Sequence, residues 1–257
     1  MNTQKKWQQL APEYIIALSK KDKGDYLRYK LLTPKLLRIL GNISNLNILD
    51  IGCGDGYLSR KLAKKGAHIY AFDWITSFIT YATTQEQNKK LTTQYCVADA
   101  LQCFPYIDSF FDIAIANMVL KDMPIIDKTI AEAYRVLKHQ GKFIVSILHP
   151  CFYMNVSQWK ARKSLSPTHS TLSFDMVAPY ISPCSFSKTV SGSKEEIQHF
   201  HRPISDYINV FCKHGFLISG MWELCLKKDM SVSQNYFYAT RIPPFLILQG
   251  IKIGKSS

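Results

Sequence analysis

The chain has 257 residues, of which 47% are hydrophobic, and a formal net charge of +13 at pH 7. This length supports one large hydrophobic core, so we expect a single domain over residues 1–257. No apolar run approaches the roughly 18 residues that a membrane-spanning helix requires. The apolar residues 14–18 follow Glu13 and are too few for a secretory signal. The composition therefore argues against a membrane-spanning or secreted protein.

The seven cysteines follow no pattern of a disulfide framework or a zinc ribbon. Their number is odd, and no two of them form a C-x-x-C pair. Thiols that stay reduced are typical of the cytoplasm. We therefore expect a cytoplasmic protein with free thiols.

The positive charge raises the question of nucleic-acid binding, because a basic groove is the usual footprint of a phosphate backbone. Only seven of the 32 basic residues are Arg, whose planar fork suits phosphate better than Lys does. The lysines occur as scattered pairs, such as Lys64-Lys65 and Lys89-Lys90. We favour a solvated basic surface and keep nucleic-acid binding as the alternative.

Residues 1–46 are expected to form a helical lead-in. Asp25 can cap a helix that starts at Tyr26, Pro34 suits a first helical turn, and Gly41 can end the segment. From Asn47 onwards, expected strands and helices alternate at the spacing of right-handed βαβ units, which predicts a mainly parallel sheet.

A glycine-rich turn follows the first expected strand. Gly52, Gly54 and Gly56 lie between residues 48–51 and a helix that begins near Tyr57. Without a Cβ, these residues let the backbone turn sharply and approach a ligand, and the first helical amides favour an anionic group. Dinucleotide-binding loops have the spacing G-x-G-x-x-G, but Tyr57 occupies their third glycine position. A nicotinamide-binding protein is therefore the weakest of the functions that we compare.

Two acidic residues follow at the ends of the next two expected strands. Asp73 lies 21 residues after Gly52, where a carboxylate can accept hydrogen bonds from both ribose hydroxyls, and Asp99 ends a strand over residues 95–98. A strand over 111–117, a helix that ends at Gly141 and a strand over 142–148 complete the pattern.

This order of motifs resembles the class I S-adenosylmethionine-dependent methyltransferases, specifically their small-molecule, type 11-like branch. The resemblance covers roughly residues 7–251. It implies an α/β, Rossmann-like fold whose seven-stranded, mainly parallel sheet has helices on both faces and ends in an antiparallel hairpin. It also implies S-adenosylmethionine as the cofactor.

The resemblance assigns roles to the strand ends. Backbone groups of Gly52, Cys53 and Gly54 would contact the methionine part of the cofactor, and Asp73 would bind the ribose hydroxyls. Asp50 ends the first strand, and its carboxylate could order the glycine loop or assist near the methionine amine.

The remaining expected cofactor contacts lie further along the sheet edge and in the lead-in. Trp74 would stack on adenine, and Asp99 would accept from the adenine amino group with the Ala100 amide nearby. Asn117 and Met118 would line the pocket close to the sulfonium. From the helical lead-in, Tyr14 and Arg28 are candidate contacts, with ordinary helix packing as an equal alternative.

The segment 149–202 interrupts the regular alternation. Crossover loops usually have about 2 to 6 residues, so this long and aromatic segment predicts a cap inserted after the fifth strand. We expect the cap to cover a small, aromatic or partly apolar acceptor. Tyr153, Trp159, His199 and His201 are its candidate acceptor contacts. His199 and His201 could join His149 around a metal ion, but no carboxylate or cysteine spacing supports this site, and we expect no metal.

His149 is the candidate catalytic residue. It follows the fifth strand on the acceptor side, and a histidine that titrates near neutrality could take a proton from the attacking hydroxyl or amine. The alternative is that its imidazole caps backbone groups of the His149-Pro150 turn. Asp122 is a second possible base, but an acid at a helix start explains it more simply.

Small-molecule methyl transfer is thus the function that the sequence favours. The alternatives are a methyltransferase of RNA or tRNA that uses the basic surface, and a cofactor-binding protein that has lost its chemistry. Salt-sensitive RNA binding would favour the first alternative.

Overall fold

The computed structural model describes residues 3–19, 26–87, 91, 93–152, 159–163, 172–176, 180–189, 195–227 and 239–254. Asp25 and Tyr153 lie outside these ranges, and for Trp159 the backbone alone is described. The predicted roles of these three residues therefore remain predictions.

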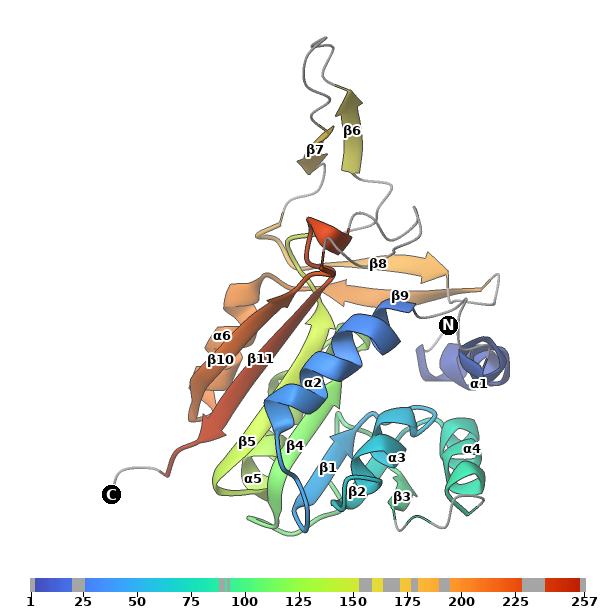
Figure 1. Ribbon diagram of the computed structural model, residues 1–257, viewed down its shortest axis with the longest axis vertical. Helices are drawn as coiled ribbons and strands as arrows, with labels where there is room; N and C mark the ends of the chain where they lie inside the picture. Colours follow the sequence, from blue (N-terminus) through green and yellow to red (C-terminus); the bar gives the residue numbers. More distant parts are fainter. Residues whose placement is uncertain are drawn as a thin grey trace.

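A seven-stranded sheet forms the centre of the molecule, in the order β10-β11-β5-β4-β1-β2-β3 (Figure 1). Neighbouring strands are parallel except at β11, which runs antiparallel to both β5 and β10. This arrangement confirms the predicted sheet and its final hairpin. The strands are β1 (Asn47–Ile51), β2 (His68–Asp73), β3 (Gln94–Val97), β4 (Phe111–Asn117), β5 (Leu137–Leu148), β10 (Phe216–Leu224) and β11 (Phe245–Lys252).

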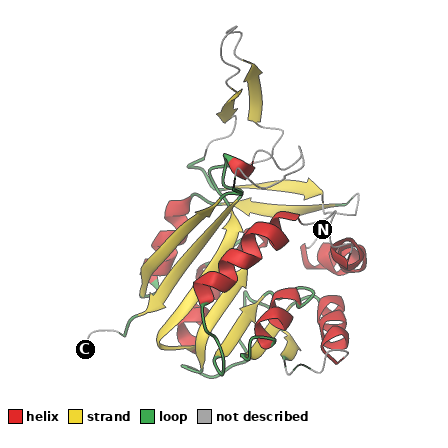
Figure 2. Ribbon diagram, in the orientation of Figure 1, coloured by secondary structure: helices red, strands yellow, loops and turns green. Residues whose placement is uncertain are grey.

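Helices cover both faces of this sheet (Figure 2). Alternate residues of each strand point to opposite faces, so β1 contributes Ile48 to one hydrophobic cluster and Leu49 to the other. The first cluster includes buried residues of α2 (Thr33–Leu40) and α3 (Tyr57–Ala63). The second includes α5 (Asp127–Val136) and α6 (Ile204–Lys213). The central parallel strands β1 and β4 are therefore buried on both sides, as their mostly apolar sequences predict.

The N-terminal helix α1 (Thr3–Ser19) and a hairpin of β8 (Cys184–Thr189) and β9 (Glu196–His201) lie beyond the carboxyl ends of the parallel strands (Figure 1). Trp7 of α1, Phe78 of α4 (Thr76–Gln87) and Ile197 of β9 share a third hydrophobic cluster. A second hairpin is formed by β6 (Trp159–Lys163) and β7 (Leu172–Met176). Both hairpins belong to the predicted insertion.

The predicted end of the fifth helix is wrong. We expected this helix to continue to Gly141, but α5 ends at Val136 and β5 begins at Leu137. Leu137 pairs with Phe111 of β4, and the pairing then shifts to Ile113 with Lys142, so the intervening residues form an irregularity in β5. Cross-strand pairing and burial of Leu137 replace the expected glycine cap.

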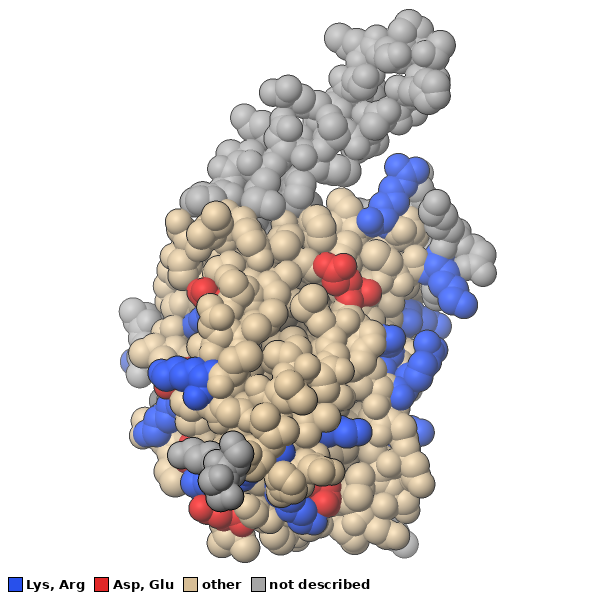
Figure 3. Space-filling view, turned by 90° about the vertical axis from the view of Figure 1, so that its left-hand side faces the viewer, with Lys and Arg blue, Asp and Glu red and all other residues tan. Residues whose placement is uncertain are grey.

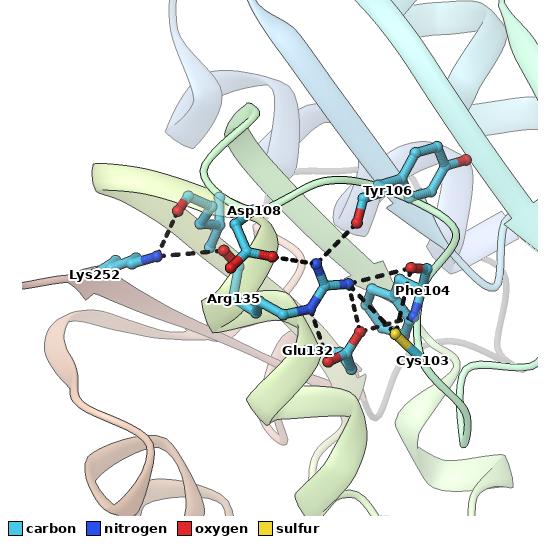
Figure 4. A network of polar contacts seen from close by, with 8 residues as sticks. Cys103, Phe104, Tyr106, Asp108, Glu132, Arg135 and Lys252 are labelled. Atoms are coloured by element: carbon cyan, nitrogen blue, oxygen red, sulfur yellow. Dashed lines mark hydrogen bonds and ion pairs between the residues drawn. The ribbon is translucent and has the colours of Figure 1, made fainter.

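Arg135 of α5 anchors the loop between β3 and β4 to this helix through hydrogen bonds (Figure 4). Its guanidinium donates to the carbonyl oxygens of Phe104 and Tyr106 and to the carboxylates of Asp108 and Glu132, at 2.6 to 3.2 Å. Five donors in one planar group suit such a loop anchor. The start of the same loop carries Asp99 and Ala100, so this network helps to fix their position.

Candidate functional site

The loop between β1 and α3 has the backbone conformation that its glycines predict. Gly52, Gly54 and Gly56 have φ values of +65°, +53° and +70°. A Cβ at Gly52 would clash with the side chain of Val119, whereas a Cβ at Gly54 would meet no atom within 4 Å. Gly54 therefore faces open space, which leaves its backbone accessible to a ligand.

Asp73 joins the glycine loop to the end of β2. One oxygen of its carboxylate accepts a hydrogen bond from the Gly54 amide at 2.9 Å, and the other accepts from the Ile75 amide at 3.0 Å. The residue is 7% exposed, and burial raises the pKa of Asp73 to about 6. Each carboxylate oxygen has a further lone pair, so Asp73 can accept additional hydrogen bonds from a ligand.

Asp50 ends β1 beneath the same loop. Its carboxylate accepts a hydrogen bond from the Ser59 hydroxyl at 2.6 Å, which links β1 to α3. Burial raises the pKa of Asp50 to about 7, and the Ser59 hydrogen bond opposes this shift only partly. Two buried acids thus lie under one glycine loop.

Two adjoining cavities open at the carboxyl ends of β1, β2 and β4. Their volumes are about 160 Å³ and about 170 Å³. Both are lined by Gly52, Asp73, Trp74, Val119 and Asp122. All twelve residues predicted from the resemblance line one or both cavities: Tyr14, Arg28, Asp50, Gly52, Cys53, Gly54, Asp73, Trp74, Asp99, Ala100, Asn117 and Met118. The structure therefore brings the predicted cofactor residues together.

The cavity at β3 has an acidic rim. Asp99 accepts a hydrogen bond from the Leu101 amide at 2.9 Å, and the Ala100 carbonyl accepts one from Thr129 of α5 at 2.8 Å. Both contacts hold the turn after β3 in place. The local role of Asp99 is thus a turn acid, and its position at the cavity also suits the predicted contact with adenine.

The end of β4 is strained. Met118 has a φ of +63°, which is uncommon for a residue other than glycine, and its amide donates to the Ser146 carbonyl at 2.9 Å. The Ser146 hydroxyl donates to the side-chain oxygen of Asn117 at 2.7 Å. These contacts with β5 hold Asn117 and Met118 at the wall of the cavity of about 160 Å³.

The predicted role of His149 as a base is not supported. The residue is fully buried, and its Nδ1 accepts a hydrogen bond from the Cys151 amide at 3.2 Å. Nε2 therefore carries the proton and donates it to Glu223, 2.8 Å away. Burial also lowers the pKa of His149. Because both ring nitrogens are engaged and His149 lines neither of the two cavities, it acts as a structural link from β5 to β10.

Asp122 lies at the site, although its sequence position is explained most simply by an acid at a helix start. It belongs to a short helical turn, η2 (Leu120–Asp122), after β4, and it lines both cavities. Nδ1 of His199 in β9 lies 2.6 Å from its carboxylate, and Lys121 Nζ lies 2.7 Å from it. The sequence did indicate a possible base here, because an acid follows the fourth strand. It did not indicate the partner, since His199 lies 77 residues away in sequence.

His201 lies close to His199 but not in the two large cavities. Its Nε2 donates to the Tyr180 carbonyl at 2.8 Å. Both histidines line a smaller cavity beside β9. Among the described residues, no group of three side chains of His, Cys, Asp or Glu is placed to hold a metal ion. In the same part of the chain, no helix is both long and apolar enough to cross a bilayer.

Residues 49–145 match a family model described as a methyltransferase domain, Methyltransf_11. The matched segment contains β1 to β4 and most of β5, with the glycine loop, Asp73 and Asp99. This chain contains a methyltransferase domain of that family. The expected family is thereby confirmed.

Relatives of the methyltransferase domain agree with this assignment. The malonyl-[acyl-carrier protein] O-methyltransferase of Hamiltonella defensa is 26% identical over 151 residues, which cover 58% of this chain and 56% of that protein. The chain thus spans little more than half of that relative.

Two solved structures share the fold. An S-adenosylmethionine-dependent methyltransferase from Mesorhizobium loti has a TM-score of 0.70 at 20% identity and covers 85% of this chain and 96% of its own. A geranyl diphosphate C-methyltransferase from Streptomyces coelicolor, solved with S-adenosyl-L-homocysteine, has a TM-score of 0.59 at 10% identity, with coverages of 86% and 78%. These likenesses confirm the Rossmann-like fold.

Proposed function

We propose that this protein transfers the methyl group of S-adenosylmethionine to a small-molecule acceptor. The observation that carries this proposal is the pair of joined cavities in a methyltransferase domain, where the glycine loop, Asp73 and Asp99 meet at adjacent strand ends. Ligands of open α/β sheets bind outside the carboxyl ends of the strands. The cavities lie at that edge.

The residues present fit this cofactor. Asp73 offers a buried carboxylate with remaining acceptor capacity to the two ribose hydroxyls. The cavity around Asp99, Ala100 and Leu101 is lined mostly by apolar side chains and suits a flat base. Gly54 leaves space for the methionine part, and a Cβ at that position would enter it. When bound, the cofactor supplies a methyl group on a positively charged sulfur, which an acceptor lone pair can displace in line.

The protein's contribution is then to orient the acceptor and exclude water. Trp7, Tyr14 and Phe78 pack in T-shaped or tilted pairs, with ring centroids 5.6 to 6.1 Å apart, and line the cavity of about 160 Å³. Asn117 and Met118 form the wall at the end of β4. These aromatic and apolar groups favour a desolvated transfer zone.

We further propose that the segment 149–202 is the acceptor-side cap. Its β8–β9 hairpin reaches the loop after β4 through the contact of His199 with Asp122, which lines both cavities. The hairpin thus meets the site at the turn after β4, and Ile197 near its tip packs against α1 and α4. The relative from Hamiltonella defensa is named for a malonyl group on an acyl-carrier protein, so the group that it methylates is small although its carrier is a protein.

RNA is the alternative acceptor, because the chain has a net charge of +13. On the face shown in Figure 3, Lys and Arg side chains lie in separate groups, mostly toward one edge, and much of the surface between them is uncharged. A continuous basic stripe is absent from the described residues on that face. This distribution favours a small acceptor over a nucleic acid.

The experiment that tests the function combines calorimetry with label transfer. S-adenosylmethionine and S-adenosylhomocysteine are titrated into the full chain, which is then incubated with methyl-labelled cofactor and either a small-molecule cell extract or total RNA. We expect both ligands to bind and label to appear in a small product. Label in RNA would favour the alternative acceptor, binding without transfer would indicate a cofactor-binding protein, and no binding would contradict the proposal.

A further inference from the structure

We propose that the acceptor carries a carboxylate, which binds in a small cavity between β9 and the loop after β4. This inference rests on the proposed function and names the chemical class of its substrate. The cavity has a volume of about 20 Å³. Four basic side chains line it, those of Lys121, His199, His201 and Arg202.

The composition of this cavity points to an anion with an apolar body. None of the described residues that line it is acidic. Its other lining side chains are Leu148, Pro150, Phe186, Phe200 and Tyr207. Basic groups beside aromatic rings suit an apolar or aromatic carboxylate, whose charge and body need different surroundings.

The small cavity shares one wall residue with the proposed site of methyl transfer. Lys121 lines both the small cavity and the cavity of about 160 Å³. Its ammonium group has three donors, of which the two oxygens of Asp122 take up to two, at 2.7 and 2.9 Å. Lys121 can therefore contact an acceptor that extends from one cavity into the other.

The β8–β9 hairpin places one more basic side chain, that of Lys188, on the face that carries His199. Phe186 pairs with His199 and Lys188 with Ile197, and His199 and Ile197 are buried. Because side chains alternate along a strand, Phe186 and Lys188 share the inner face of the hairpin with them. Lys188 thus points toward the core on the same face as His199.

The electrostatics of this group agree with an anionic ligand. Burial, and then the charge of Lys121, lower the pKa of Lys188 to about 8. Burial and Lys121 also lower the pKa of His199. The Asp122 carboxylate contacts Lys121 and His199 and offsets this repulsion only in part, and a ligand carboxylate would offset the repulsion that remains between Lys121 and Lys188.

A space of about 10 to 15 Å³ on this scale holds one water-sized group, so a cavity of about 20 Å³ has room for a small charged group such as a carboxylate.

The test compares benzoate with its neutral analogue benzamide, and with inorganic phosphate, by calorimetry on the full chain. Each probe is titrated with and without S-adenosylhomocysteine. If S-adenosylhomocysteine does not bind, the proposed function is contradicted, and the affinities for benzoate and benzamide can still be compared in its absence. The variants are Lys188→Gln and Lys121→Gln. Lys138→Gln is the control, because Lys138 is half exposed and pairs with Asp112 at the opposite end of the sheet.

We expect benzoate to bind at least about tenfold more tightly than benzamide, which lacks the charge, and than phosphate, which lacks an apolar body for the aromatic lining. Lys188→Gln and Lys121→Gln should each weaken benzoate binding about five- to tenfold, and Lys188→Gln should leave S-adenosylhomocysteine affinity within twofold. Lys138→Gln should bind benzoate as the wild type does. Equal affinity for benzoate and benzamide, stronger binding of phosphate, or the same loss in the control variant would overturn the proposal.

Discussion

Nδ1 of His199 lies 2.6 Å from a carboxylate oxygen of Asp122. A carboxylate can only accept, so the imidazole donates to it through Nδ1. The contact joins β9 of the insertion to the turn after β4, and Asp122 lines both cavities. The position of the hairpin and the shape of the cavity wall are therefore linked by this hydrogen bond, beside those that Arg202 donates to the carbonyl oxygens of Leu120 and Met123.

Asp122→Asn should loosen this link. Burial opposes the charge of Asp122, but Lys121 and His199 outweigh it and lower its pKa. The stabilisation is therefore present above the unfolded pKa of 3.8 and is lost as the pH falls through the lower folded value. At pH 7 we expect a loss of about 1.5 to 3 kcal/mol in unfolding free energy.

Hydrogen exchange locates that effect. Amides of β9 should exchange faster in Asp122→Asn than in the wild type. Asp112→Asn is the matched control, because Asp112 also accepts from a lysine, Lys138, at 2.7 Å, but far from the hairpin. Unchanged β9 exchange in Asp122→Asn would show that the hairpin does not depend on this contact.

Asp73→Ala should weaken the binding of S-adenosylhomocysteine. The variant loses a buried carboxylate that accepts from the Gly54 amide and, in our proposal, from the ribose. We expect a cost of roughly 1.5 to 3 kcal/mol, or about 10- to 150-fold in the dissociation constant measured by calorimetry. An affinity within experimental error of the wild type would remove Asp73 from the ribose site.

Gly54→Ala and Gly41→Ala together distinguish the loss of stability caused by a Cβ at positive φ from the exclusion of ligand by the added methyl group. Both glycines have positive φ, and a Cβ at either meets no atom within 4 Å. Each substitution should cost roughly 1 to 2 kcal/mol of stability in urea unfolding. Only Gly54→Ala places a methyl group in the cavity, so it alone should lower the affinity for S-adenosylhomocysteine, by tenfold or more. Equal affinities in the two variants would contradict the assignment of this loop.

Asp50 should make the ligand-free protein less stable as the pH rises. Its folded pKa of about 7 lies above the unfolded value of 3.8, so between about pH 4 and 7 the folded state binds more protons. The free energy of unfolding then falls with increasing pH over this window. Urea unfolding of Asp50→Asn should show a smaller slope, with a remainder between about pH 4 and 6 from Asp73. Identical slopes in the variant and the wild type would argue against a protonated Asp50.

His149→Ala should affect stability more than cofactor binding. The variant loses the contacts with Glu223 and the Cys151 amide and leaves a cavity beneath the turn after β5. We expect a loss of about 2 to 4 kcal/mol in unfolding free energy and S-adenosylhomocysteine affinity within twofold. A stable variant that binds cofactor but has lost methyl transfer would restore His149 as the base.

The grouping of residues around the two cavities could be predicted because its signals are local. Gly52 and Gly54 have positive φ within one turn, Asp73 ends β2, and Asp99 lies two residues after β3. In a parallel sheet with right-handed connections, the carboxyl ends of adjacent strands meet at one edge, so local residues define a common cavity.

The acceptor side could not be predicted in the same way. His149 contacts Glu223 across 74 residues, and His199 contacts Asp122 across 77. The orientation of each imidazole depends on where a distant strand packs, which no periodicity encodes. The prediction that the helix ends at Gly141 was wrong for a similar reason, because Leu137 pairs with Phe111 of β4 and the helix ends at Val136.

A structure of the protein crystallised with S-adenosylhomocysteine tests the central claim most directly. We predict adenine in the cavity lined by Asp99 and Leu101, both ribose hydroxyls on the Asp73 carboxylate, and the sulfur toward Asn117 and Met118. A ligand bound elsewhere on the chain, or bound in this cavity with its ribose away from Asp73, would contradict the account.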